Sequence, residues 1–339
     1  MRNKKVIALI LILCMALSCT AMAKVDNQGK TTIDAYIDGV IPQMLQMAGL
    51  KGEIVSISDP VRVVNHPEEK MQLVLVGLDG QYVGALAVSE LNGQLTSNFI
   101  PLENEAAQKA LYDEEPFSVC YQDGAVYILT KDSTAFLQGQ RNAENRVMDT
   151  GTVKSVAQTR MLNLNAAAGN LRSWDSYTLP YSLVTTSNKA KTWAACLASC
   201  YNYHHGTNLS ADSMITLIDN SSPYSSPFCD DYWIGVGYSV IGWSSCSHNV
   251  GSSATYELFY DTIITDHKPI LLQFHFPSVE MVLLAYGLST DGSSMTISVR
   301  DPNQGYTSYT NIYASSCPSG ITYWLSSYGY SVSLYRVHS

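Results

Sequence analysis

The sequence predicts an α+β protein in which helices pack on antiparallel sheets in two successive modules. Three observations lead to this prediction. Apolar residues recur at helical spacing over residues 31–49. Short apolar runs joined by Asp-Gly dipeptides, typical of β-hairpins, come next. Toward the C-terminus, helical patterns precede alternating strands, which is the element order of an α+β fold.

The first 23 residues are predicted to be a signal peptide. A basic start at residues 2–5 precedes an apolar run, and residues 21–23, Ala-Met-Ala, form a small-x-small cleavage site. The chain is therefore expected to be secreted or held at the cell surface after cleavage near Ala23. A lipoprotein anchored through Cys19 is the alternative, but the residues before Cys19 lack the Leu that such signals usually carry.

Charge and composition exclude several classes of partner. Without the signal peptide, 17 basic residues face 29 acidic ones, so neither a nucleic acid nor an anionic membrane surface is expected to bind. No later segment approaches the ~18 apolar residues of a membrane span. Metal-ligand spacing such as C-x-x-C is absent, and the sequence predicts no metal site and no cofactor. Cys229 and Cys246 are the expected disulfide pair, whereas Cys196 and Cys200 are expected to be buried thiols.

The residue distribution divides the mature chain. All five tryptophans and 17 of the 22 tyrosines follow residue 170, whereas the charged residues concentrate earlier. We expect an N-terminal α+β module over 24–140, a linker over 141–174 and a second domain over 175–339.

The first module is predicted to lay a helix, bent or restarted at Pro42, on a meandering sheet. Its expected elements are a helix at 31–49, strands at 52–58, 61–65, 71–77 and 82–91, a helix at 104–111, and strands at 117–122 and 125–131. The second domain begins with helices, of which the first ends at Gly206 and the second has Ser210 as its N-cap. Its expected elements are helices at 193–206, 210–219 and 253–266 and strands at 268–276, 279–287, 294–305 and within 321–339.

The helix at 193–206 has the sequence expected around a catalytic thiol, which is most reactive at a helix N-terminus beside an imidazole. Residues 193–196, Trp-Ala-Ala-Cys, and 202–203, Asn-Tyr, resemble papain-like cysteine peptidases of the exported, bacteriocin-processing type. Streptopain-like enzymes give the same register through Tyr203-His204. The resemblance covers 175–339 and implies a papain-like domain, with a helical half and an antiparallel sheet half, preceded by a prodomain-like module.

This resemblance implies a role for several positions. Thr192 occupies the position of the nucleophilic cysteine. The glutamine of the oxyanion hole falls on Thr186, and Asn188 is the nearest amide. The catalytic histidine falls on Met281 by its spacing to Gly287, or on Glu280 by the local pattern "EMVLL", whereas Asp301 retains the orienting acid. Trp193, Glu280 and His275 are the expected ligand-contacting residues.

The sequence therefore favours an inactive pseudo-peptidase that binds an extended peptide or protein ligand in a cleft. Two alternatives stay open. One is an active cysteine peptidase with displaced catalytic groups, such as Cys196 with His275. A two-residue turn at 277–278 would place His275 opposite Glu280 in a hairpin. The other is a surface or adhesion module that reuses a common fold.

Overall fold

The computed structural model describes most of the chain after residue 31. The described residues are 32–61, 71–91, 94–112, 117–122, 125–129, 134–136, 158–164, 175–221, 231–244, 246–275, 280–326 and 333–339. The chain forms two compact units, Met1–Ile41 and Pro42–Ser339. Both candidate sites considered below belong to the second unit.

The mixed α+β class is the one predicted from the sequence. Within the described residues there are seven α-helices and a large antiparallel sheet. The helices are α2 (Thr32–Met47), α3 (Glu105–Tyr112), α5 (Thr192–His205), α6 (Ala211–Ser221), α7 (Asp231–Ile241), α8 (Tyr256–Phe259) and α9 (Cys317–Ser326). None of these described helices combines the length and apolar character needed to cross a membrane.

Twelve strands form one sheet, and every pairing in it is antiparallel. Their order is β10 (His248–Val250), β15 (Ser333–His338), β11 (Ile270–His275), β12 (Glu280–Thr290), β13 (Ser294–Asp301), β14 (Tyr306–Tyr313), β4 (Gln94–Pro101), β3 (Gln81–Leu91), β2 (Met71–Leu78), β1 (Ile54–Ser58) and β8 (Gln158–Asn163), with β9 (Asp175–Thr178) paired to β12. A separate small sheet contains β5 (Ser118–Gln122), β6 (Ala125–Leu129) and β7 (Thr134–Phe136).

The two regions predicted as separate modules contribute strands to the same sheet. Strand β4, from the region 24–140, pairs with β14, from the region 175–339, through Phe99 and Tyr309 among others. Beside that pair, the Thr310 hydroxyl donates to the Asn98 side-chain oxygen at 3.1 Å. Strand β8 lies within the predicted linker and pairs with β1. Backbone hydrogen bonds therefore run continuously from one region into the other.

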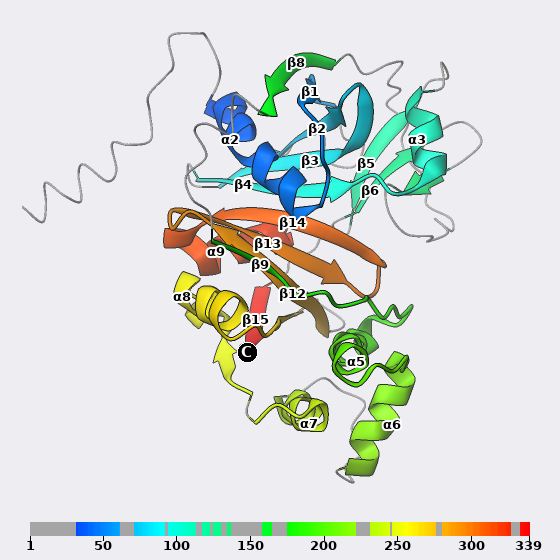
Figure 1. The fold of residues 1–339 in the computed structure, drawn as a ribbon, viewed down its shortest axis with the longest axis vertical. Helices are drawn as coiled ribbons and strands as arrows, with labels where there is room; N and C mark the ends of the chain where they lie inside the picture. The colour runs from blue at the N-terminus through cyan, green and yellow to red at the C-terminus, as the bar shows by residue number, and fades with distance from the viewer. Residues whose placement is uncertain are drawn as a thin grey trace, which may run out of the picture. The chain divides into compact units, whose positions relative to one another are not determined.

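Strand β12 is buried on both faces, because helices cover the sheet on each side. Val282, Leu284 and Tyr286 pack with residues of α5, α6 and α7. Met281 and Leu283 lie in a second cluster with residues of α8 and α9. In Figure 1, α5, α6 and α7 form a group separate from α8 and α9. Because successive side chains of a strand point to opposite faces, only those in the first cluster can contact the start of α5.

Turn and cap residues predicted several element boundaries correctly. Asp79 and Gly80 have φ of 50° and 86° at the turn between β2 and β3, as a two-residue hairpin turn requires. Gly206 ends α5 with φ of 63°, a left-handed conformation that suits glycine. The Ser210 hydroxyl accepts the Ser213 N–H at 3.1 Å and caps α6.

The helix expected at 31–49 is α2, a single helix that contains Pro42. Other expected boundaries were wrong. The region 321–339, within which strands were expected, contains β15 but begins with the end of α9, because Ile321 and Trp324 pack against the sheet at helical spacing. The helix expected at 253–266 is a short α8 followed by a π-helix at Tyr260–Thr265. Helix α7 and strand β14 were not anticipated.

A buried polar network joins the C-terminal part of α2 to three strands of the sheet. The Gln43 amide nitrogen donates to the Ser289 carbonyl at 3.0 Å, and its oxygen accepts the Thr296 hydroxyl at 2.9 Å. The Asn311 amide donates to that same Thr296 oxygen at 2.9 Å. Gln43, Thr296 and Asn311 are all buried. Each polar group gains a partner that compensates for lost water.

Replacing Gln43 with Leu should destabilise the fold. The substitution leaves the Ser289 carbonyl and the Thr296 hydroxyl buried without this partner, a loss of about 1–3 kcal/mol in the free energy of unfolding. Urea denaturation measures the change. Gln46→Leu, at an exposed position of the same helix, is the matched control and should change stability by less than about 0.5 kcal/mol. Equal effects of the two substitutions would contradict a stabilising role for this network.

Candidate functional site

The site implied by the sequence lies at the start of α5. Asn188 caps a short 3-10 turn at Lys189–Lys191, because its side-chain oxygen accepts the Ala190 N–H at 3.0 Å. Thr192 is the first residue of α5. The residue that the sequence resemblance assigned to the nucleophile position is thus at a helix N-terminus, where backbone N–H groups and the helix dipole favour an anion.

The Thr192 hydroxyl connects the helix to the sheet. It donates to the Lys189 carbonyl at 2.8 Å and accepts the Val282 N–H of β12, also at 2.8 Å. The residue is 0% exposed. A hydroxyl that is inaccessible to solvent and already engaged as donor and acceptor is poorly placed to attack a substrate, and an alcohol is far less acidic than a thiol.

The loop before α5 and the turn after β13 are joined. The Thr186 N–H donates to the Pro302 carbonyl at 2.9 Å, and the Asn303 side-chain amide donates to the Thr186 carbonyl at 3.2 Å. Asp301, at the end of β13, is buried and accepts the N–H groups of Asn303 and Gln304 through Oδ1. The structure therefore brings Thr186 beside the turn that Asp301 organises.

Met281 lies on the face of the sheet away from α5, so it is not the position that meets Thr192. Its side chain packs in the cluster with α8 and α9, whereas Val282 packs in the cluster with α5. The register of β12 with β13 shifts between Ala285 and Gly287. Counting back from Gly287 with a regular alternation therefore assigns the wrong face, because a bulge inserts one extra residue.

Glu280 and His275 lie at the hairpin end of β12 and β11, where they are cross-strand partners as expected. Residues 276–279 lie outside the described part of the chain. The His275 Nδ1 to Glu280 Oε1 distance is 3.8 Å, and the His275 side chain is 58% exposed. Gln273 also donates to the Glu280 carboxylate, at 2.8 Å. This carboxylate is held by two groups on β11.

Cys196 and Cys200 are fully buried, as predicted. The Cys196 thiol lies one turn into α5 and donates to the Val282 carbonyl at 3.6 Å. Burial raises the pKa of Cys200 well above its ordinary value. These features are those of core thiols. The predicted Cys229–Cys246 disulfide involves Cys229, which lies outside the described residues.

A cavity of about 340 Å³ adjoins the start of α5. It is bordered by the loop before α5, by α6 and by α7. Its lining residues are Asn188, Ala190, Lys191, Trp193, Asp212, Ile215, Thr216, Asp219 and Trp233. The Lys191 ammonium pairs with the Asp212 carboxylate at 2.5 Å. The buried Trp193 indole N–H has no hydrogen-bond partner among the described residues.

An apolar wall and an exposed carboxylate suit ligand binding. Ile215 offers apolar contact and Asp219 favours a cation, whereas Asp212 is already paired with Lys191. Sequence reasoning identified Trp193 but missed Asp212, Asp219 and Trp233. No local motif marks them, since only the packing of three helices brings them together.

Comparison with known proteins assigns no family. No protein-family model matches the chain, and no curated protein is similar to it.

Replacing Thr192 with Val should lower stability. Val fills the same volume but leaves the buried Val282 N–H without this acceptor, at a cost of about 1–3 kcal/mol in the free energy of unfolding. Thr192→Ser keeps the hydroxyl and loses one methyl group, worth about 0.8 kcal/mol. Chemical denaturation of both variants tests this ordering.

The matched control is Thr216→Val, on the exposed surface of α6, which should change stability by less than about 0.5 kcal/mol. If Thr192→Val left stability unchanged and removed a hydrolytic activity, the structural role would be wrong and a catalytic one would replace it.

Proposed function

We propose that the protein is an exported, papain-like pseudo-peptidase that binds an extended peptide segment without cleaving it. The observation that carries this proposal is that the residue at the proposed nucleophile position is buried and already hydrogen-bonded. The Thr192 hydroxyl is buried and bonded to Lys189 and Val282, and the family's histidine position by spacing, Met281, belongs to the opposite core. Loss of nucleophile and base from such sites typically costs on the order of 10⁶ in rate.

The cavity beside α5 is the proposed ligand site. In papain-like domains the cleft runs past the helix start, and here the cavity adjoins that point. A Lys or Arg side chain would lay its methylene groups along the Ile215 side chain and direct its charge toward the Asp219 carboxylate, because long basic side chains combine apolar and charged contact. The proposed ligand class is therefore an extended peptide with a basic residue.

Export is part of the proposal and is supported by the N-terminal sequence pattern. Residues 1–31 lie outside the described structure. The prodomain-like role of the region 24–140 belongs to the same proposal. The pairing of β4 with β14 favours a region that stays attached to the second domain, because releasing it would break a continuous ladder of backbone hydrogen bonds.

The protein should hydrolyse neither casein nor peptide libraries. Incubation followed by mass spectrometry tests this, together with labelling by thiol-directed peptidase inhibitors. We expect no cleavage products and no inhibitor adduct at Cys196. Single-site labelling of Cys196 with turnover would contradict the pseudo-enzyme proposal and support an active peptidase with displaced groups.

Peptides containing Lys or Arg should bind at the cavity, and Asp219→Asn should weaken that binding. Asp219 is exposed, so the expected loss is about two- to fivefold and should shrink at high salt. Titration calorimetry with matched Lys and norleucine peptides measures it. Asp261→Asn, an exposed acidic position outside the cavity lining, is the control. Equal loss in both variants, or no preference for Lys over norleucine, would exclude this site.

A further inference from the structure

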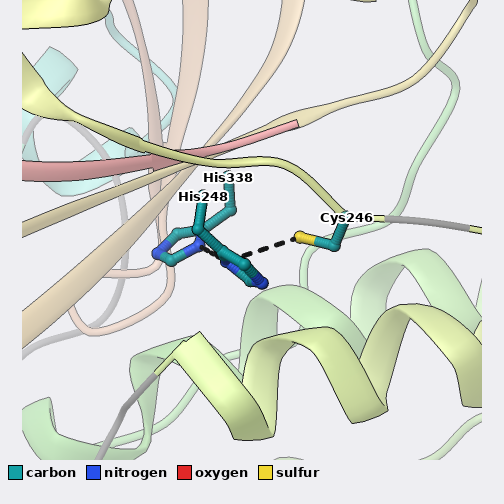
Figure 2. Close-up of side chains that lie close together, drawn as sticks. All are labelled: Cys246, His248 and His338. Carbon is teal, nitrogen blue, oxygen red and sulfur yellow. Dashed lines mark hydrogen bonds between the residues drawn. The ribbon is translucent and has the colours of Figure 1, made fainter.

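Three potential metal ligands converge at one end of the large sheet. Cys246 lies two residues before His248, the first residue of β10, and His338 is the last residue of β15. Strands β10 and β15 are antiparallel, and His248 and His338 are direct cross-strand partners. Figure 2 shows the two imidazoles side by side, with the Cys246 thiol directed toward them. The ligand atoms of all three residues lie within 4.8 Å of one another.

The distances are close to those of a tetrahedral zinc site. His248 Nδ1 and His338 Nδ1 are 2.7 Å apart, and Cys246 Sγ is 3.8 Å from His248 Nδ1. With zinc–nitrogen bonds of ~2.0 Å and zinc–sulfur bonds of ~2.3 Å, tetrahedral ligand atoms are roughly 3.3–3.6 Å apart. A separation of the two imidazoles by about half an ångström, and no change of backbone register, would open the space for the ion.

Hydrogen bonds outside the cluster set the tautomer of His338. The Gln273 amide nitrogen donates to the Glu280 carboxylate, which only accepts, so the Gln273 oxygen faces His338. His338 Nε2 must then carry the hydrogen and donate to Gln273 at 2.7 Å. The Nδ1 lone pair of His338 is therefore directed into the cluster. Metal-binding histidines are typically oriented in this way, by donation from the second ring nitrogen.

The surroundings favour a neutral His338 imidazole and oppose an isolated Cys246 thiolate. Burial, and then the neighbouring His248 and Arg336, lower the pKa of His338 to about 3. Burial and the Asp231 carboxylate raise the pKa of Cys246 to about 12. A divalent cation would reverse the second effect, since metal coordination deprotonates a thiol. Arg336 forms an ion pair with Asp231 at 3.2 Å, which holds that carboxylate near the cluster.

Helix α7 leaves room for the His248 ring. A Cβ atom at Gly235 would lie 3.5 Å from His248 Nε2, so the helix approaches the imidazole closely at a residue without a side chain. One turn further along α7, the Tyr238 hydroxyl donates to the His338 carbonyl at 3.2 Å and fixes the end of β15. The two histidines are thus positioned by α7 as well as by their strand pairing.

We propose that Cys246, His248 and His338 bind one Zn²⁺ ion through the Cys246 thiolate and the two Nδ1 atoms, with a fourth position open to water. A soft thiolate with two imidazoles is a ligand set that suits zinc. Without the metal, His248 donates to His338 and the same atoms form a hydrogen bond. The site is independent of the proposed peptide cavity and links the C-terminal strand to the chain after α7.

Zinc binding to the full chain tests the proposal. Equilibrium dialysis followed by elemental analysis should give one zinc per chain, and Zn²⁺ should raise the melting temperature. Cys246→Ser and His248→Gln should each remove that zinc. Gln273→Met keeps all three ligands and should weaken zinc binding by about 10–100-fold, because it removes the group that orients His338. Co²⁺ in place of zinc should give a thiolate-to-metal charge-transfer band that is absent in Cys246→Ser.

The control is His267→Asn, which removes an exposed imidazole outside the cluster and retains a residue tolerant of its φ of 57°. It should bind zinc like the unmodified chain. Three results would overturn the proposal: no zinc bound to a protein shown to be folded, zinc bound equally by Cys246→Ser and His248→Gln, or a native Cys229–Cys246 disulfide detected by peptide mapping. The last would remove the thiolate ligand.

Discussion

The contact between the start of α5 and strand β12 is the constraint on which the packing of the helices against the C-terminal strands of the large sheet depends. Thr192 accepts the Val282 N–H and donates to its own preceding turn, so a single hydroxyl fixes the height of the helix on the sheet. Cys196 adds a contact to the carbonyl of the same strand residue. Because β12 is buried on both faces, any shift of α5 would also disturb the packing beneath α8 and α9.

The segments beside that contact are also held together by hydrogen bonds. A helix N-terminus, an adjoining loop and an acidic turn are held together through Thr186, Asn303 and Asp301. The cavity lies beside the helix start and is bordered by residues of the loop, α5, α6 and α7. The proposed ligand site and the contacts that stabilise the helix start thus lie in neighbouring residues.

A chain of hydrogen-bonded polar side chains crosses the sheet near the end of β11 that pairs with the start of β12. It runs from Glu280 through Gln273 to His338 and then to His248. Each member limits the hydrogen-bonding choices of the next, so the orientation of one carboxylate fixes an amide and then an imidazole. The C-terminal strand therefore holds, besides its backbone pairing, an imidazole whose Nδ1 lone pair is directed toward His248.

Local signals determined part of this protein without help from tertiary structure. The turn at Asp79-Gly80, the end of α5 at Gly206 and the cap of α6 at Ser210 follow from backbone conformation and short-range hydrogen bonds, which depend on a few neighbouring residues. The α+β class and the burial of Cys196 also followed from periodicity and residue type. These features needed no knowledge of which segments pack together.

Tertiary structure decided what each side chain meets. The bulge before Gly287 sets the facing of Met281, and it depends on how β12 pairs with β13. The union of β4 with β14 joins segments about two hundred residues apart. The cluster of Cys246, His248 and His338 likewise forms only when β10 and β15 align, and its spacing matches no local metal motif. A sequence records spacing along the chain, whereas the grouping of ligand residues and the sheet face on which a side chain lies depend on distances between segments that are far apart in the sequence.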